Sequence, residues 1–325
     1  RWYDNDVDKH DANLFARANW SVAKGLRLFA DLQYRYVSYQ AWGVNDNYVS
    51  EEVGMQPIDV DKQYHFFNPR AGVSYTLAER NNFYLSFAVA QKEPTRSDFT
   101  DRYKFAADPS SEKLYDWELG YQYTAPRLSL GVNLYYMKYK DQLVPTGMVN
   151  DDSNALNTNV PDSYRRGVEL SASWRATGWF TVGANATFSQ NRIESYVDAL
   201  KDSPTYGKEL GDMTIAYSPD VIANAFLNFH HRGFEAVFHT QHVGKQYFTN
   251  NENDALSLDA YCVTNLNLAY TFRTRSARSV RLGLLINNLF NAEYESNGYG
   301  YSYMDTWSGP APVRIDEAYY FRRRR

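Results

Sequence analysis

The sequence has little of several things that often define a protein class. It contains one cysteine, Cys262, which excludes a disulfide framework within the chain and any multi-cysteine zinc or iron–sulfur site. With 18 glycines and 11 prolines in 325 residues, it is neither collagen-like nor of low complexity. Its formal charge is −4, from 34 basic and 38 acidic residues, so no strong electrostatic field points to nucleic acid.

Long hydrophobic runs are missing as well. No stretch approaches 18 consecutive apolar residues, and the mean hydropathy is −0.59, which excludes membrane-spanning helices. A spanning β-barrel remains compatible, because only every second residue of its strands is apolar. Aromatic residues, by contrast, are abundant: Tyr, Phe and Trp make up 16% of the chain, which excludes wholesale disorder.

Hydrophobicity alternates with a period of two along most of the chain. From Ala12 to Val22 the even positions are apolar and the odd ones mostly polar, and after Lys24-Gly25 the pattern resumes. Two strands joined by a tight turn predict a β-hairpin. Equivalent pairs predict about twelve strands, with further hairpins over 63–91, 113–140, 167–189, 221–247 and 261–289.

The predicted connections alternate between short and long. Short ones are expected at 24–25, 78–82, 125–126, 176–178, 231–233 and 273–279, and long ones at 40–61, 92–112, 141–162, 194–218, 248–259 and 291–312. A meander with short turns on one rim and long loops on the other is typical of outer-membrane barrels. The expected strands, of roughly 10 to 14 residues, also exceed the roughly 5 to 6 residues usual in soluble sheets and suit the roughly 9 to 11 that span a bilayer. The sequence therefore predicts an all-β fold, a transmembrane antiparallel meander β-barrel.

Three segments, in order along the chain, resemble motifs of one family. VAQKEPT at 89–95, followed by SEKL at 111–114 and WELGY at 117–121, is similar to the "PEK…E-x-G" segment of TonB-dependent receptors. RGVEL at 166–170 resembles their "RGVE" strand, and NNLFNAEY at 287–294 resembles the "NNLFN-x-x-Y" motif before their last strand. VGKQY at 243–247 is similar to the branch of the family common in Bacteroidetes.

The resemblance implies the C-terminal part of a 22-stranded receptor barrel. Residues 1–325 would supply about twelve strands, with the plug domain and the N-terminal strands absent from this chain, and Arg1 without an initiator Met or signal sequence fits a mature or partial chain. The chain ends in Arg322 to Arg325 where the family continues into a closing strand, so we expect it to be cut or incompletely built at both ends.

The resemblance also implies a function. We expect a ligand-gated outer-membrane transporter that imports a scarce nutrient, with an iron–siderophore complex favoured and cobalamin, haem or an oligosaccharide as alternatives. Its partners would be the inner-membrane TonB energising complex through the plug, outer-membrane lipids, an extracellular small molecule and, for this branch, a surface lipoprotein, but no nucleic acid. The location would be the outer membrane of a Gram-negative bacterium.

Catalytic motifs such as G-x-S-x-G, a P-loop or H-E-x-x-H are absent, so an enzyme, a cofactor or a bound metal is not expected. Aromatic residues in or beside the long connections offer flat apolar area with a polar edge, suited to a ligand at the mouth. The candidates are Trp42, Tyr48, Tyr103, Tyr247, Tyr299, Tyr301 and Trp307. Arginines on the polar strand faces are candidates for contact with the plug or an anionic ligand: Arg17, Arg27, Arg35, Arg70 and Arg175.

Two other classes remain open. A complete 12-stranded barrel, acting as a passive pore or an enzyme, would also have these strands. A soluble carbohydrate-binding β-protein would show the same alternation, because one face of its sheets packs on a core.

Overall fold

The computed structural model describes residues 4–101, 108–149, 155–200, 202–273, 278–309 and 311–322. These residues are almost entirely β-structure, and within them the structure has one short α-helix and one 3-10 turn. The elements are β1 (Asp4–Ala23), β2 (Leu26–Ser50), β3 (Gly54–Leu77), β4 (Asn81–Lys92), α1 (Arg96–Thr100), β5 (Glu112–Thr124), β6 (Leu128–Val149), β7 (Ala155–Arg175), β8 (Phe180–Ile193), β9 (Met213–Thr214), β10 (Val221–His231), β11 (Phe234–Val243), β12 (Gln246–Tyr247), η1 (Asp254–Leu256), β13 (Ser257–Leu258), β14 (Tyr261–Phe272), β15 (Val280–Ile286), β16 (Glu295–Asp305) and β17 (Val313–Arg322).

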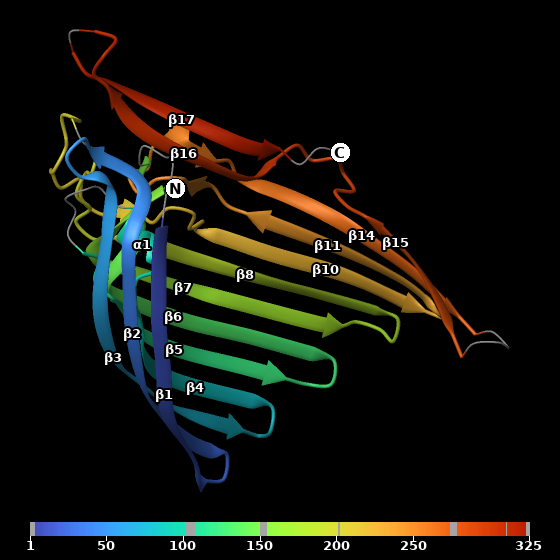
Figure 1. Cartoon of the computed structure of the whole chain (residues 1–325). Coiled ribbons are helices and arrows are strands. Elements are labelled where there is room, and N and C mark those ends of the chain that lie inside the picture. Colours follow the sequence, from blue (N-terminus) through green and yellow to red (C-terminus); the bar gives the residue numbers. More distant parts are fainter. Residues whose placement is uncertain are drawn as a thin grey trace.

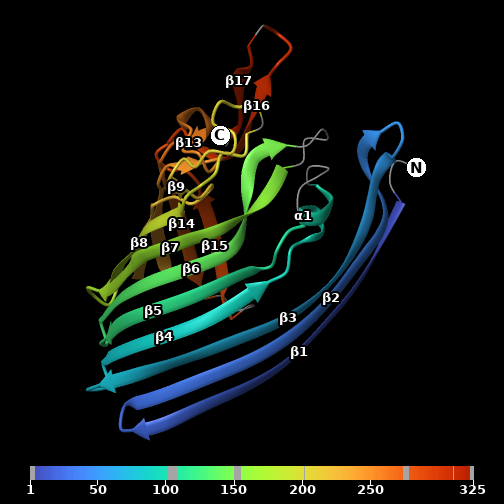
Figure 2. The same ribbon diagram turned by 90° about the vertical axis from the view of Figure 1, so that its left-hand side faces the viewer.

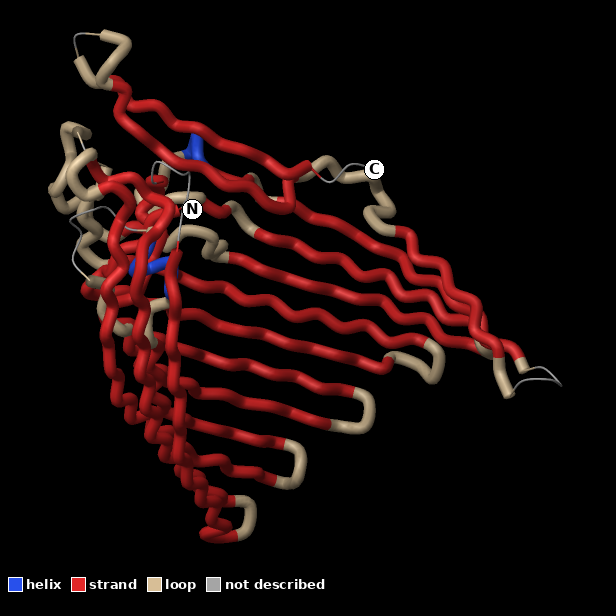
Figure 3. Tube along the Cα trace, viewed as in Figure 1, coloured by secondary structure: helices blue, strands red, loops and turns tan. Residues whose placement is uncertain are grey.

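The main sheet is an antiparallel meander. Its order is β1-β2-β3-β4-β5-β6-β7-β8-β10-β11-β14-β15, with the two-residue β9 paired to β8, so the twelve expected strands are confirmed. The sheet curves strongly and does not close on itself (Figures 1 and 2). Short turns follow one edge and the longer connections gather at the other, as Figure 3 shows and as the sequence predicted.

The two faces of the sheet differ in chemistry. Leu14, Trp20 and Leu32, at even positions of β1 and β2, are 75%, 53% and 48% exposed, as expected of a lipid-facing surface. On β8, Phe180 and Phe188 lie on one face of the strand, eight residues apart, as expected of aromatic side chains at the two membrane interfaces. The aromatic excess of the sequence is thus largely explained by this wall.

The prediction that residues 40–61 and 141–162 form loops was wrong, because most of these residues continue the neighbouring strands. β2 has 25 residues and β3 has 24, and they stay paired from Leu26 opposite Tyr75 to Ser50 opposite Gly54. β6 and β7 likewise continue their pairing to Val149 opposite Ala155. All four strands are about twice as long as the roughly 9 to 11 residues that span a bilayer, so they project beyond it.

A reversal of the hydrophobic pattern explains this correction. Within the predicted membrane band of β2 the apolar residues are at even positions and point outward. Beyond Tyr36 they are at odd positions, and Val37, Tyr39 and Ala41 are 0%, 8% and 3% exposed. In this projecting part of β2 the outer face meets water and the inner face packs against a core. Apolar and polar residues therefore still alternate, but the apolar ones now point inward.

Four small cores stabilise the projecting rim. Their members come from strand extensions and from connections far apart in the sequence. They are Tyr39, Ala41, Ile58, Val60 and Phe99; Val144, Val160, Ile193, Tyr196 and Ile215; Met148, Leu156 and Leu200; and Phe248, Leu256 and Leu258. Burial raises the pKa of Tyr196 to about 12. The rim is therefore a packed cap and not a set of independent loops.

Two of the family-like motifs have a clear steric basis. A Cβ at Gly120 would lie 2.0 Å from the ring of Tyr84, and a Cβ at Gly167 would lie 2.7 Å from the hydroxyl of Tyr135 and 2.4 Å from the carbonyl oxygen of Phe188. Each glycine leaves the space that an aromatic ring of the neighbouring strand fills.

The third motif closes a turn through side chains. Asn288 accepts from the backbone N–H of Ala292 at 2.8 Å and donates to its carbonyl at 2.9 Å. The backbone N–H of Asn288 in turn donates to the side chain of Asn265 on β14 at 2.9 Å. Asn288 and Asn291 have φ values of 52° and 53°, a conformation that asparagine tolerates better than most residues.

We expect Gly120→Ala to destabilise the barrel by about 1 to 3 kcal/mol, because the added methyl group overlaps the ring of Tyr84. The urea midpoint of the folded receptor in detergent measures the effect. Pairing it with Tyr84→Ser should recover part of the loss, since the ring that causes the overlap is then gone. An equal or larger loss in the double variant would contradict the steric explanation.

Candidate ligand-binding rim and inner wall

The concave face of β1 to β4 carries a row of charges. Arg17 of β1, Asp31 of β2 and Arg70 of β3 are consecutive register partners across the three strands. Arg17 binds Asp31 through two hydrogen bonds, with Nε to Oδ1 at 2.7 Å and Nη2 to Oδ2 at 3.1 Å. The guanidinium carbon of Arg70 lies 5.4 Å from the centre of the Phe29 ring. One carboxylate thus lies between two cations on a wall that faces inward.

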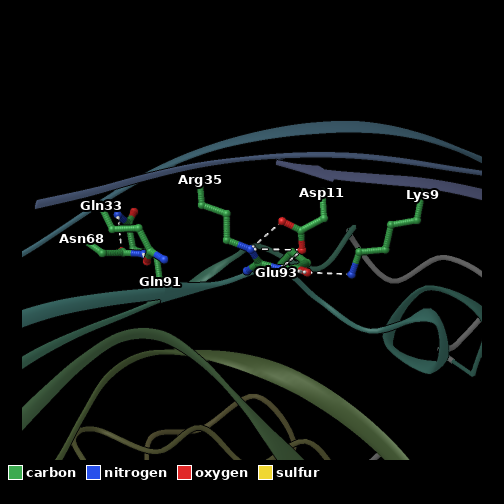
Figure 4. A network of polar contacts seen from close by, with 7 residues as sticks. All are labelled: Lys9, Asp11, Gln33, Arg35, Asn68, Gln91 and Glu93. Carbon is green, nitrogen blue, oxygen red and sulfur yellow. Dashed lines mark hydrogen bonds and ion pairs between the residues drawn. The ribbon is translucent and has the colours of Figure 1, made fainter. Parts of the chain in front are cut away.

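A second cluster of charged side chains lies on the same wall, closer to the rim that carries the long connections (Figure 4). Arg35 Nη2 lies 2.6 Å from Asp11 Oδ2, and Arg35 Nη1 lies 2.8 Å from Glu93 Oε2. Lys9 Nζ completes the cluster at 2.7 Å from Glu93 Oε1. Glu93 is only 8% exposed, so its charge depends on these two cations. Two cations and two anions make the cluster neutral.

Side-chain amides continue the network beside this cluster. Asn68 donates to Gln33 Oε1 at 3.1 Å, and Gln91 donates to the carbonyl of Phe67 at 2.9 Å (Figure 4). Because Gln91 and Glu93 immediately precede α1, the amides and the charges together hold the start of this connection against β1 to β3.

The other two predicted lumen arginines lie apart from the cluster. Arg27 lies at the short-turn end of β2, opposite Ser21 and Ser74. Arg175 lies at the end of β7, opposite Thr181, and β3 to β6 separate it from β2 in the sheet. The structure therefore brings together Arg17 and Arg70 on either side of Asp31, places Arg35 in the separate cluster with Asp11 and Glu93, and leaves Arg27 and Arg175 apart from both.

The short helix α1 connects distant parts of the rim. Its first turn is capped by Asp98, which accepts from the backbone N–H of Thr95 at 2.7 Å. The other oxygen of Asp98 accepts from Asn157 of β7 at 2.9 Å, and Arg96 donates to Asn5 of β1 at 2.6 Å. Since β1 and β7 are six strands apart, α1 spans the curve of the sheet between them, as Figure 2 shows.

The hairpin β16–β17 forms a separate two-stranded sheet on the long-connection rim (Figures 1 and 2). One face packs closely on the rim: a Cβ at Gly298 or Gly300 would lie 2.7 or 2.9 Å from the Phe248 ring. The opposite face exposes an aromatic ladder in which Tyr299 stacks on Tyr319, with ring centres 4.9 Å apart.

One carboxylate lies within this ladder. Glu317 Oε2 accepts from the hydroxyls of Tyr301 and Tyr319, each at 2.8 Å, and Oε1 accepts from Tyr303 at 3.2 Å. The Tyr319 and Tyr301 hydroxyls hold the pKa of the Glu317 carboxyl below its usual range. The same contacts raise the pKa of Tyr301, because its proton is shared with an anion. The face combines flat apolar area, hydroxyl groups and one negative charge.

The remaining ligand candidates are dispersed. Trp42 and Tyr48 are 48% and 54% exposed on the β2 extension, toward the opposite end of the sheet from the hairpin. Tyr247 lies in β12, with Lys245 Nζ 5.0 Å from its ring centre, and Trp307 at the hairpin tip is 94% exposed. Tyr103 lies outside the described residues. Of the predicted set, only Tyr299 and Tyr301 share one surface with further aromatic residues.

Sequence reasoning did not select several residues that complete these sites. Glu317 and Tyr319 were not among the candidates, although YGYSY at 299–303 already places Tyr303 with Tyr299 and Tyr301 on one face of a strand. Glu93 lies in the VAQKEPT motif, yet nothing in the sequence placed it beside Arg35, 58 residues away.

Two searches of the described residues are negative. No helix within the described ranges is long and apolar enough to cross a membrane. The same residues hold no group of three or more His, Cys, Asp or Glu side chains placed to bind a metal ion.

A curved antiparallel meander with an apolar outer face and a charged inner face defines the wall of a membrane β-barrel. The family model for the TonB dependent receptor-like β-barrel matches residues 1–289, and the chain belongs to that family. This family comprises receptors and transporters of the Gram-negative outer membrane.

Solved structures share the fold at low sequence identity. The copper transporter OprC is 19% identical, with a TM-score of 0.70 over 97% of this chain. The ferric yersiniabactin uptake receptor FyuA from Yersinia pestis is 16% identical, with a TM-score of 0.66 over 98% of this chain. The siderophore receptor PiuA from Acinetobacter baumannii is 13% identical, with a TM-score of 0.71 over 98%. The chain spans 47%, 46% and 42% of these three proteins, respectively.

Proposed function

We propose that residues 1–325 form the C-terminal portion of the barrel of an outer-membrane receptor that imports a scarce nutrient under the control of TonB. The observation that carries this proposal is the curved twelve-strand wall, polar inside and apolar outside, topped by a packed rim. A plug domain supplied by the rest of the protein would fill the concave side and connect it to the inner-membrane energising complex. The barrel wall itself has no catalytic role in this scheme.

The inner-wall charges support a plug contact. Arg17, Arg35 and Arg70 all lie on β1 to β3, and Arg17 keeps a side chain that is 66% exposed in spite of its bond to Asp31. A plug surface with carboxylates placed toward β1 to β3 would satisfy these cations. Arg27 and Arg175, near the short turns, would contact the plug at positions of their own.

We propose an iron–siderophore complex as the imported ligand. Two of the structurally similar proteins are described as a ferric yersiniabactin receptor and a siderophore receptor, whereas a third is a copper transporter. The exposed aromatic ladder of β16–β17 offers flat apolar area with hydroxyl edges to the apolar and aromatic groups of a chelate. The proposal extends to outer-membrane lipids around the barrel and to a surface lipoprotein above it.

Transport by the whole receptor provides the test. A Gram-negative strain without other ferric receptors, producing the full-length protein, should take up radiolabelled ferric siderophore only when TonB is present. Uptake of cobalamin, haem or an oligosaccharide instead would change the ligand and keep the mechanism. Uptake that continues without TonB would contradict the mechanism itself.

Replacement of Tyr299, Tyr301 and Trp307 together by Ala should weaken ligand binding roughly tenfold or more and leave membrane insertion intact. These side chains offer exposed aromatic area, and their loss removes about 1.4 kcal/mol or more of contact free energy. Equilibrium binding to the purified receptor measures the effect, with Trp179→Ala as a control, because Trp179 is 50% exposed in the short connection between β7 and β8, away from the hairpin. Unchanged affinity would place the ligand site elsewhere on the rim.

A further inference from the structure

The oxygen atoms around Glu317 form a compact donor set on the exposed face of β16–β17. The Tyr301 and Tyr319 hydroxyls each lie 2.8 Å from Glu317 Oε2, and the two hydroxyls also contact one another. Tyr303 reaches the other carboxylate oxygen at 3.2 Å. Three phenol groups on two strands therefore converge on one carboxylate.

We propose that this cluster binds a ferric ion, with the oxygens of Tyr301, Tyr319 and Glu317 as ligands. Each of the two phenols releases its proton to solvent and forms one iron–oxygen bond, and the carboxylate contributes a third. Iron stays in the +3 state, and two phenolates and one carboxylate balance its charge. Water fills the other coordination positions, and Tyr303 holds the carboxylate through its hydrogen bond.

The spacing fits an octahedral ion. In an octahedron with metal–oxygen bonds of about 2.0 Å, neighbouring ligand oxygens are about 2.8 Å apart. Both phenol oxygens already lie at this distance from the carboxylate oxygen. The shared protons thus hold the ligands at the separation that a metal ion would require, and little rearrangement of the strands is needed.

The ligand chemistry selects a hard, strongly acidic cation. Carboxylate and phenolate oxygens prefer hard cations. A phenol has an ordinary pKa of about 10, and the contact with Glu317 raises the pKa of Tyr301 further, so at neutral pH only a strong Lewis acid displaces these protons. Ca²⁺ and Mg²⁺ are too weak for this, whereas Fe³⁺ is strong enough.

The cluster is accessible and is not needed to pack the hairpin. Tyr303 and Tyr319 are 42% and 44% exposed, whereas packing on the rim uses the opposite face, where Gly298 and Gly300 approach Phe248. A metal ion can therefore reach the donors without displacing a core residue. The inference goes beyond the proposed transport, because it assigns a metal to the hairpin whichever ligand the receptor imports.

Titration of the full-length receptor in detergent with ferric nitrilotriacetate tests the site. We expect a visible phenolate-to-iron charge-transfer band that saturates at one iron per receptor. Tyr301→Phe with Tyr319→Phe should abolish the band, and Glu317→Gln should weaken iron binding roughly tenfold. Tyr299→Phe is the matched control, because Tyr299 belongs to the same ladder and stacks on Tyr319 without bonding Glu317, and it should keep the band.

Two results would overturn the proposal. One is a receptor that shows no charge-transfer band at any iron concentration. The other is a band that survives in the double phenylalanine variant while thermal unfolding shows an intact fold. Siderophore uptake by the unsubstituted full-length receptor separates this site from transport. Absent uptake with the band present would count against the proposed function alone, and intact uptake with no band would count against the iron site alone.

Discussion

The 325-residue chain produced alone is expected not to insert into lipid vesicles as a closed barrel, whereas the full-length receptor does. In the sheet as described, β1 pairs only with β2 and β15 only with β14, so each end of the wall has an unpaired strand edge. In lipid every unpaired backbone group costs several kcal/mol, and closed barrels avoid this cost by having no edges. In the receptor proposed above, strands outside residues 1–325 would supply the pairing.

Protease protection in vesicles measures this outcome. The full-length receptor should be protected over its strands, and the 325-residue chain should be digested along β1 and β15. Adding the remaining part of the receptor as a separate chain should restore protection by pairing both edges. A protected chain with discrete channel conductance on its own would instead support the complete 12-stranded pore, and a monomer stable without detergent would support the soluble carbohydrate-binding protein.

Most of the wall could be predicted from the sequence because period-two alternation and turn residues are local signals. Lys24-Gly25 marks a hairpin in any context, and Gly25 has the positive φ that such a turn requires. The extensions could not be predicted in the same way. Tyr39 and Ala41 alternate as regularly as the rest of the strand, but their core includes Phe99, more than fifty residues later.

The site was predicted less completely for a related reason. Tyr299 and Tyr301 attract attention as aromatics in a long connection, but their relation to Glu317 depends on the register between β16 and β17. A shift of one residue would move the carboxylate to the other face of the hairpin. This register depends on tertiary structure, and no short sequence motif predicts it. The contact between Arg35 and Glu93 could not be predicted for the same reason.

The start of α1 fastens the rim to the inner wall of β1 to β3. It is held to β1 and β2 by the Arg35 cluster and reaches β7 through Asp98 and Asn157. Loss of the Arg35 cluster should therefore lower the local stability of the rim more than that of the membrane-spanning part of the strands. This makes Arg35 the most informative position on the inner wall.

We expect Arg35→Met to destabilise the rim by about 2 kcal/mol, between the small effect of exposed ion pairs and the 3 to 5 kcal/mol, roughly, of fully buried ones. The change leaves the nearly buried Glu93 with Lys9 alone and removes the partner of Asp11. Hydrogen exchange of the α1 amides in the full-length receptor measures the effect, as faster local opening with little change in the β8 and β10 strands. Arg17→Met is the matched control: its side chain is 66% exposed, so we expect a loss below about 1 kcal/mol.

A double-mutant cycle separates charge pairing from simple packing. Adding Glu93→Gln to Arg35→Met removes the carboxylate that the first change leaves unpaired, so the combined loss should be smaller than the sum of the two single losses. Additive losses would mean that Arg35 acts through its contact with the Phe66 ring, 5.9 Å from its guanidinium carbon, and not through the buried ion pair. Protection of α1 that is unchanged in Arg35→Met would contradict the role of the cluster in fastening the rim to the wall.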